Sequence, residues 1–245
     1  MLRNRDLPTP ATALAIAAHP DDVEFGAGGT LAKWAASGCV VNHLVCTDGS
    51  KGSWDPSDDT AALIAVRQDE QRAAAKALGA TGDVVFLGYT DGELQSGLDE
   101  RERVARVIRE LRPEVVLGHD PWRRYRLHPD HRHAGQLAVE GIVAARDPHF
   151  FPEQGVAHWR PSVLLLWEAD EVDHVEDVSS FVDAKLAALL EHRTQLRSTM
   201  HIEIGADNEE QQRDHFRRRV LDRLATFGRT AGIAYAEGFK RIDQL

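Results

Sequence analysis

This chain of 245 residues has two cysteines and fewer basic than acidic side chains, and each shortage excludes some classes of function. The two cysteines, Cys39 and Cys46, flank an expected strand that would hold them about 23 Å apart at ~3.3 Å per residue, so they cannot pair with each other. The 29 Lys and Arg are outnumbered by 39 Asp and Glu, and the net charge of −10 repels nucleic acid and anionic bilayers. We therefore expect neither nucleic acid nor a membrane as a partner.

Long apolar runs are also missing. No stretch of 18 apolar residues occurs, and residues 1–10 carry charges and prolines where a secretion signal would need an apolar segment. We expect a cytoplasmic protein whose cysteines stay reduced. The content of 42% apolar and 28% charged residues, with 19 Gly and 10 Pro, excludes disordered, collagen-like and coiled-coil chains. Residues 1–245 are expected to form a single domain, with a homo-oligomer left open.

Short apolar segments alternate along the chain with longer segments of helical periodicity. Strands are predicted at residues 13–18, 40–47, 84–87, 115–118 and 162–168, and helices at 30–37, 60–78, 99–111, 130–145, 181–196 and 209–226, before a short tail at 235–242. This alternation indicates an α/β fold, a Rossmann-like, doubly wound, mostly parallel sheet with helices on both faces. In its common strand order, 3-2-1-4-5, the first and fourth strands are neighbours.

Two motifs of acids and histidines follow two of the predicted strands. HPDD, residues 19–22, leaves the first strand, and HPDH, residues 128–131, follows the fourth. Because the chain reverses its direction between these neighbouring strands, both motifs should meet in a crevice at their carboxyl ends. Either motif alone would also suit a helix N-terminus, with Asp21 or Asp130 bonded to backbone N–H groups.

Together the two motifs supply the ligands of a divalent metal. A catalytic zinc site uses three imidazole or carboxylate ligands and leaves a fourth position for water. His19, Asp22 and His131 are spaced to provide these three ligands. Asp21 and His128 then remain beside the open position, where amide hydrolysis needs a base and a group that supports the oxyanion. Two histidines and one carboxylate also describe non-haem iron sites, so the pattern leaves the metal's identity open.

Between residues 15 and 141 the chain resembles the LmbE-like or PIG-L family of zinc-dependent N-acetyl-sugar deacetylases. The resemblance is carried, in the family's order, by AHPDD with VEFGAGGTLAKW, by TDGS, by R-x-x-E at residues 67–70, by YTDGEL and by HPDH. It implies one Zn²⁺ per chain, held by His19, Asp22 and His131. It further implies that Asp21 is the general base and that His128 stabilises the tetrahedral intermediate.

The resemblance also implies roles for three residues outside the metal set. Asp130 would orient His128, and Arg67 and Asp91 would lie near the sugar. Without the resemblance, Arg67 could instead form an i,i+3 ion pair with Glu70 on a helix. Asp91, which precedes a glycine, could simply belong to a turn.

Two long loops follow the second and the fourth predicted strands, at residues 48–59 and 119–129. Aromatic side chains in these loops are candidates for binding a sugar. Some family members have a tyrosine two residues before the first histidine of HPDH, whereas this chain has Arg126 there and Tyr125 one place earlier. Tyr125 is therefore a candidate substrate-binding proton donor. Trp54 and Trp122 also lie in these loops, where a flat apolar face can stack on a sugar ring.

The predicted activity is hydrolysis of an N-acetyl amide on a small-molecule sugar, releasing acetate and a free amine. A metal-dependent phosphoesterase on a similar scaffold and an amidase acting on a thiol-sugar conjugate are the alternatives. A dinucleotide-binding protein is disfavoured because Gly26, Gly28 and Gly29 lie too far beyond the first strand and in the wrong spacing. A metal-holding binding module without turnover would lack a base, and Asp21 is present.

Overall fold

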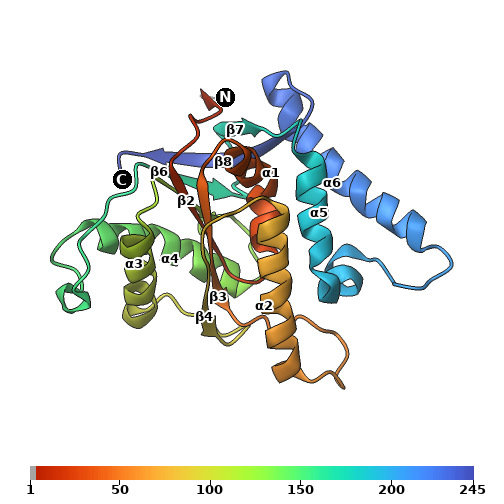
Figure 1. Ribbon diagram of the computed structural model, residues 1–245, viewed down its shortest axis with the longest axis horizontal. Coiled ribbons are helices and arrows are strands. Elements are labelled where there is room, and N and C mark those ends of the chain that lie inside the picture. Colours follow the sequence, from red (N-terminus) through yellow and green to blue (C-terminus); the bar gives the residue numbers. More distant parts are fainter. Residues whose placement is uncertain (1–3) are drawn as a thin grey trace.

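The structure is a computed structural model that describes residues 4–245, and its centre is an eight-stranded sheet (Figure 1). Strand β8 runs antiparallel to its neighbours β6 and β7, and the other pairings are parallel. Across the sheet the strands follow the order β1 (Asn4–Arg5), β7 (His174–Asp177), β8 (Ala236–Asp243), β6 (Val163–Trp167), β5 (Val115–His119), β2 (Thr12–Ala17), β3 (Val40–Thr47) and β4 (Val84–Tyr89).

Helices cover both faces of the sheet. On one face lie α3 (Leu98–Leu111) and α4 (Pro129–Arg146), to the left in Figure 1. On the other face lie α1 (Asp22–Ala36), α2 (Thr60–Ala77) and α5 (Val182–Glu191), with α6 (Glu209–Ala231) packed outside α5. Short helical segments at Pro152–Gln154, Arg193–Gln195 and Leu196–Met200 complete the helical part of the chain.

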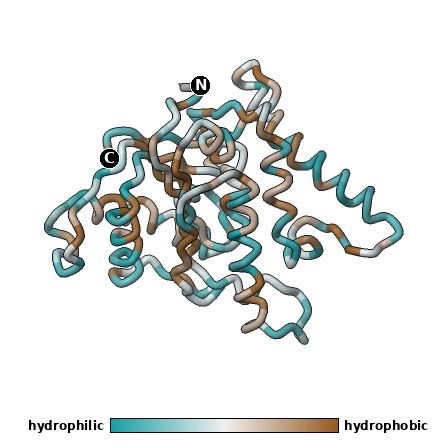
Figure 2. Tube along the Cα trace, in the orientation of Figure 1, coloured by the Kyte–Doolittle hydropathy of each residue, from teal (hydrophilic) through white to brown (hydrophobic). Residues whose placement is uncertain are grey.

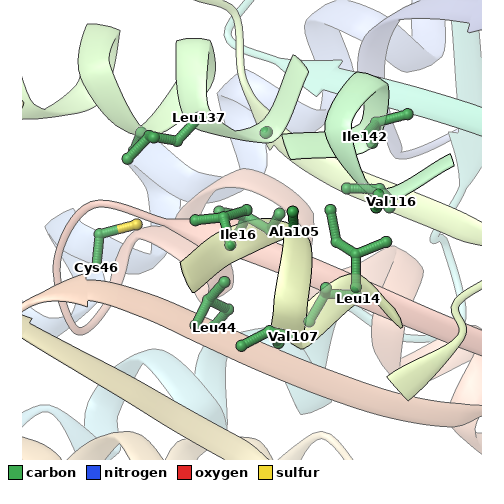
Figure 3. Close-up of a cluster of buried hydrophobic side chains, with 14 of the residues drawn as sticks. Leu14, Ile16, Leu44, Cys46, Ala105, Val107, Val116, Leu137 and Ile142 are labelled. Carbon is green, nitrogen blue, oxygen red and sulfur yellow. The ribbon is translucent and has the colours of Figure 1, made fainter. Parts of the chain in front are cut away.

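Two apolar layers hold the helices to the sheet. The side chains of β2 alternate, so that Leu14 and Ile16 pack in the layer under α3 and α4 (Figure 3), while Ala13 and Ala15 pack in the layer under α1 with Trp34. Figure 2 shows the hydrophobic strands at the centre and hydrophilic stretches on the outer helices. Burying each large apolar side chain stabilises the fold by about 1.5–3 kcal/mol.

The strand order predicted from the sequence is confirmed. The predicted strands one to five are β2, β3, β4, β5 and β6, and they lie in the order β4-β3-β2-β5-β6. The fold is therefore the expected α/β class, with the change of chain direction between β2 and β5. Within residues 4–245 both cysteines are free and buried, and no helix is long and apolar enough to cross a membrane.

Helix α1 begins at Asp22, eight residues before the predicted start at residue 30. Its glycines weaken the helical signal, but close packing requires two of them. A Cβ at Gly26 would lie 2.6 Å from the Trp167 ring, and one at Gly29 would lie 2.8 Å from Val178. The contacts of this helix with β6 and with Val178, just after β7, thus override its low intrinsic propensity.

The predicted helix at residues 181–196 and the predicted tail at 235–242 are wrong in part. Helix α5 ends at Glu191, and the chain continues as a 3₁₀ turn and a π-helical turn up to Met200. The tail is β8, a buried antiparallel strand, and β7 beside it was not predicted. The polar sequence of β7, HVED, does not suggest a buried strand. Glu176 is nevertheless fully buried, because it is paired with Lys33.

Candidate metal centre and active-site cleft

The two predicted motifs meet at the carboxyl ends of β2 and β5. These strands pair in parallel, with Ile16 opposite Gly118, so the turn after β2 and the loop after β5 emerge side by side. The turn after β2 carries His19, Asp21 and Asp22, and the start of α4 carries the HPDH residues.

Asp22 lies between the two histidines that were predicted to share a metal with it. Its Oδ2 is 3.4 Å from Nδ1 of His19, and its Oδ1 is 3.3 Å from Nε2 of His131. Ligand atoms about 2.1 Å from a tetrahedral zinc lie about 3.4 Å from one another. His19 and His131 also form, with His128, a group whose nitrogens all lie within 4.8 Å. The two contacts of Asp22 use different oxygens, and Asp22 forms a second such group with His119 and His131. Imidazole and carboxylate donors of this kind suit a borderline divalent cation.

Charges within the cluster set the protonation of these groups. Burial opposes ionisation of Asp22, but the adjacent His131 and His119 hold its pKa well below the usual range. Burial would lower the pKa of His19, but hydrogen bonds to Asp130, Asp22 and Asp91 raise it well above the ordinary value. Burial lowers the pKa of His131 to about 4, so its ring is neutral, as a metal ligand must be.

His119, at the end of β5, is a residue of the centre that sequence reasoning did not assign. Its Nε2 lies 3.2 Å from Oδ2 of Asp22, and its Nδ1 accepts a hydrogen bond of 3.0 Å from the indole N–H of Trp167. An indole N–H can only donate, so Nδ1 of His119 is the acceptor, and its Nε2, which has no hydrogen-bond partner among the described residues, lies toward Asp22. His119 also belongs, with Asp22 and His131, to a group of ligand atoms within 4.8 Å of one another that could hold a metal ion.

Arg126 and Glu168 form a second unassigned pair behind the centre. Nη1 of Arg126 lies 2.7 Å from Oε2 of Glu168 and 3.0 Å from Nδ1 of His131. The Arg126 side chain is 7% exposed, so it places a buried charge beside a predicted ligand. The sequence did not indicate the ion pair of Arg126, because its partner Glu168 lies 42 residues away.

Asp21 occupies a strained position next to the predicted ligands. Its φ of 100° is left-handed, which costs a non-glycine residue about 1–3 kcal/mol. Its N–H donates to Oε1 of Gln71 at 3.0 Å, and Nη2 of Arg67 lies 3.6 Å from its Oδ2. Burial raises the pKa of Asp21 to about 6, against the opposing charge of Arg67. A carboxyl group with such a pKa suits general base catalysis near neutral pH.

Asp130 does not hold His128 in the way that was expected. Its Oδ2 is 3.2 Å from Nε2 of His19 and 2.6 Å from the N–H of Gly92, while Oδ1 accepts from the N–H of Leu94. No hydrogen bond joins Asp130 to His128 within residues 4–245. The Asp130 carboxylate therefore orients His19, because the first turn of α4 directs it inward, where it is fully buried.

His128 is exposed, and its ring lies over the other two histidines. Its centroid is 4.6 Å from that of His19 and 5.0 Å from that of His131. Partial burial and the adjacent His19 lower the pKa of His128, so the ring is neutral at pH 7 rather than an imidazolium. A neutral imidazole still offers one N–H donor to a developing oxyanion.

Arg67 and Asp91, the predicted sugar-binding residues, both reach the cleft. Arg67 is 3% exposed and donates to the carbonyl oxygens of Gly49 and Pro20, which joins the two loops that border the site. The alternative pairing with Glu70 is not formed, because Glu70 accepts from the N–H and the hydroxyl of Thr194. Asp91 lies with Oδ1 3.2 Å from Nε2 of His19.

A cleft of about 500 Å³ opens over the centre. Of the predicted site residues it is lined by His19, Asp21, Asp22, Arg67, Asp91, His128 and His131.

Two of the three candidate aromatic residues lie elsewhere. Trp122, 57% exposed, lines a separate hollow with Asp120 and Lys240, and Tyr125 is 93% exposed on its loop. Among the described residues, neither belongs to the lining of the cleft. Trp54 does line it, together with Gln195 from the irregular segment after α5.

Comparison with known proteins agrees with this geometry. The family model described as PIG-L, GlcNAc-PI de-N-acetylase, matches residues 14–142. A diacetylchitobiose deacetylase from Thermococcus kodakarensis is 33% identical over 235 residues, which cover 95% of this chain and 83% of the relative. The chain is 36% identical over 170 residues to a 1D-myo-inositol 2-acetamido-2-deoxy-alpha-D-glucopyranoside deacetylase from Streptomyces scabiei, a match that covers 58% of this chain and about half, 51%, of that relative.

A solved structure extends the likeness to three dimensions. The N,N'-diacetylchitobiose deacetylase from Pyrococcus horikoshii, complexed with its inhibitor MPG, has a TM-score of 0.84 and 28% sequence identity to this chain. The match covers 96% of this chain and 84% of that one. Since the family model matches more than half of the sequence and the Thermococcus relative aligns along nearly all of it, the chain belongs to the PIG-L family.

Proposed function

We propose that the protein hydrolyses the N-acetyl amide of an N-acetylglucosamine unit, releasing acetate and a free amine, with one Zn²⁺ held by His19, Asp22 and His131. The observation that carries the proposal is the placement of Asp21, a carboxyl group of raised pKa, in one cleft with that donor set. The deacetylase names of the Thermococcus and Streptomyces relatives support the substrate class.

Zinc, when bound, would supply a Lewis acid that polarises the acetyl carbonyl and lowers the pKa of water. The protein's own base for this reaction is Asp21, which accepts a proton from the attacking water. Arg67, 3.6 Å from Oδ2, favours the ionised carboxylate that this step needs. Because Gln71 fixes the backbone N–H of Asp21, the carboxylate is held at the floor of the cleft before substrate arrives.

Collapse of the tetrahedral intermediate breaks the C–N bond and requires a proton on the amine nitrogen. Asp21, protonated by the attacking water, donates that proton to the nitrogen. The oxygen of the water thus ends in acetate and the transferred proton in the amine, so no second proton donor is needed. His128, which lines the cleft with its ring 4.6 Å from that of His19, offers an N–H to the oxyanion. Asp91, which also lines the cleft, offers a carboxylate to the sugar hydroxyls, and Arg67 holds Gly49 and Pro20 in place beside it.

The direct test is release of a primary amine and acetate from N-acetylglucosaminides by the zinc-loaded protein. Asp21→Asn should keep its metal and lose about 10²- to 10⁴-fold in turnover, the usual contribution of general acid–base catalysis. Phosphate release from sugar phosphates, with no amine from any N-acetyl sugar, would support a phosphoesterase instead. Selective cleavage of thiol-sugar conjugates would narrow the activity to an amidase of that class.

A further inference from the structure

Helix α5 runs beside α1 and contacts its first turn, which begins at Asp22 (Figure 1). Lys185 on α5 and His192 at its end are seven residues apart, or two helical turns, and therefore lie on the same side of the helix. Nζ of Lys185 donates to the carbonyl oxygens of Glu24, at 2.8 Å, and Phe25, at 2.9 Å. Nε2 of His192 lies 3.1 Å from Oε2 of Glu24. Both side chains thus hold residues that closely follow the predicted ligand Asp22.

The Glu24 carboxylate extends this contact from α5 to the predicted base. Its Oε1 accepts from Nε2 of Gln71, on α2, at 2.8 Å, and Oε1 of Gln71 accepts from the N–H of Asp21. Glu24, Gln71 and His192 are all fully buried. A chain of three hydrogen bonds therefore runs from His192 through Glu24 and Gln71 to the backbone of Asp21.

Lys185 is also paired with Glu237 of β8, and this ion pair contacts the backbone of α1 at two places. Nζ of Lys185 lies 2.6 Å from Oε1 of Glu237, and the two carboxylate oxygens accept from the N–H groups of Gly29 and Thr30. A Cβ at Gly28 would lie 3.3 Å from Cγ of Lys185, so the glycine lets the lysine side chain pass close to the helix. The pair thus fixes α1 at its first turn and again about one turn later.

Stability alone does not account for these buried charges. Lys185 and Glu237 are each 3% exposed, and burial lowers the pKa of Lys185 although the charge of Glu237 opposes this shift. Apolar side chains of similar volume are often as stabilising as a buried ion pair, or more so, because taking two charges out of water is costly. The ion pair differs from an apolar pair in one respect, since it binds particular carbonyl and N–H groups of α1 and so fixes the position of that backbone.

We propose that Lys185 and His192 are positioning residues for the metal centre and the base, and that they act by fixing the first turn of α1 at Glu24. The inference rests on the proposed function for its effect on turnover, and on the donor set alone for its effect on zinc affinity. It gives α5 a role in the site, although no residue of Val182–Glu191 is among the described residues that line the cleft.

The first test replaces the ion pair by apolar side chains of similar size, in Lys185→Met combined with Glu237→Leu. The N–H groups of Gly29 and Thr30 can then donate to the carbonyl oxygens four residues earlier, so α1 should stay helical. The free energy of unfolding should be unchanged or higher. Zinc affinity, measured by calorimetry on metal-free protein, should fall about 10-fold, and kcat on an N-acetylglucosaminide should fall by a similar factor with little change in KM.

The matched control is Lys33→Met combined with Glu176→Leu. This ion pair also joins α1 to the sheet, but Lys33 lies in the last turn of the helix, remote from Asp22. Zinc affinity and kcat should keep their parental values in the control. An equal fall in both double variants, or parental zinc affinity and kcat in the variant without Lys185 and Glu237, would show that the Lys185 pair serves only the fold.

A second comparison, at His192, does not depend on the folding of the double variant. His192→Gln keeps an N–H donor for Oε2 of Glu24, whereas His192→Leu removes it. We expect kcat and zinc affinity to fall about 10-fold in His192→Leu and to recover for the most part in His192→Gln, with KM little changed in both. Equal losses in the two variants would overturn the role of His192. If the parent protein releases no amine from any N-acetyl sugar, the proposed function fails, and the zinc affinities of the metal-free variants still decide the positioning role.

Discussion

The backbone N–H of Asp21 donates to Oε1 of Gln71, a side chain from the middle of α2, at the point where the chain takes a left-handed conformation. Gln71 is fully buried, and its amide is itself fixed. Nε2 lies 2.8 Å from Oε1 of Glu24 and 3.1 Å from Nδ1 of His43. The two N–H bonds of the amide thus have two acceptors, so its oxygen is directed at Asp21. The strained turn that presents the base depends on this arrangement.

Replacing Gln71 by Leu should therefore impair catalysis more than metal binding. The N–H of Asp21 would lose its acceptor in a buried place, at a cost of about 1–3 kcal/mol, and the strained turn would relax. We expect kcat to fall about tenfold or more, with the zinc content and KM little changed. Steady-state kinetics and metal analysis on the same preparation measure both effects.

The swap Gln71→Glu with Glu24→Gln gives a rescue test for this role. A carboxylate at position 71 still accepts from Asp21, and an amide at position 24 donates to it, so the swap should recover part of the lost kcat. If Gln71→Leu turned over substrate at the normal rate, the hydrogen bond would be structural only.

The metal set makes a prediction about binding that needs no substrate. If His131 is one of three protein ligands, as we propose, His131→Ala should abolish stoichiometric zinc binding. His133→Ala is the matched control, since His133 lies two residues further on α4 and contacts Ser96 instead. Zinc titration of both variants checks the assignment, and full occupancy in His131→Ala would contradict it.

Asp21 should also make the metal-free fold depend on pH. Its folded pKa of about 6 lies above the ordinary 3.8, so ionisation is harder in the folded state than in the unfolded state. The group has no effect below about pH 4, where both states hold the proton, and it destabilises the fold increasingly between about pH 4 and pH 6, above which the loss stays constant. Asp21→Asn should therefore be more stable than the parent above pH 6, by on the order of 1–3 kcal/mol.

Thermal unfolding of chelator-treated protein between pH 4 and pH 8 measures this difference. The melting temperatures of parent and Asp21→Asn should converge at the acid end and separate toward pH 8. A gap that stays constant over the range would mean that the Asp21 carboxyl group is not held at a raised pKa.

The central sheet was predictable from sequence because its strands are short and almost purely apolar. Strands β2, β3 and β5, which end at Ala17, Thr47 and His119, contain few polar residues. Those few are buried by specific partners. Strand β7 was not predictable, because the burial of Glu176 depends on Lys33, which is 143 residues away in the sequence. The turns after α5 are likewise shaped by Glu70 and Gly52, which are distant in sequence.

The motifs located the centre, but they did not reveal what supports it. His19, Asp22 and His131 follow from spacing and strand order alone. Gln71 and His119 acquire their roles through contacts that a single sequence does not show, and neither lies in one of the two motifs. The contacts of Asp130 were not foreseen for the same reason, since its carboxylate meets His19 and the backbone of Gly92 rather than His128.

Trp167 offers a test of whether the orientation of His119 matters to the metal. Its indole N–H donates to Nδ1 of His119 at 3.0 Å and so keeps Nε2 of the ring toward Asp22. Trp167→Phe would remove this donor, and the ring could then turn its other nitrogen to Asp22. Since losing a partner of a ligand usually costs 10- to 100-fold in affinity or activity, we expect about a tenfold weaker zinc affinity and a lower kcat.

Trp34→Phe separates the hydrogen bond from the loss of ring volume. Both tryptophans are almost completely buried, but the indole N–H of Trp34 has no partner among the described residues. Each substitution leaves a similar cavity and should lower the unfolding free energy by a similar amount, about 1–3 kcal/mol. Zinc affinity should fall in Trp167→Phe and not in Trp34→Phe. An equal fall in both would trace the effect to packing, and the orientation of His119 would then have no part in zinc binding.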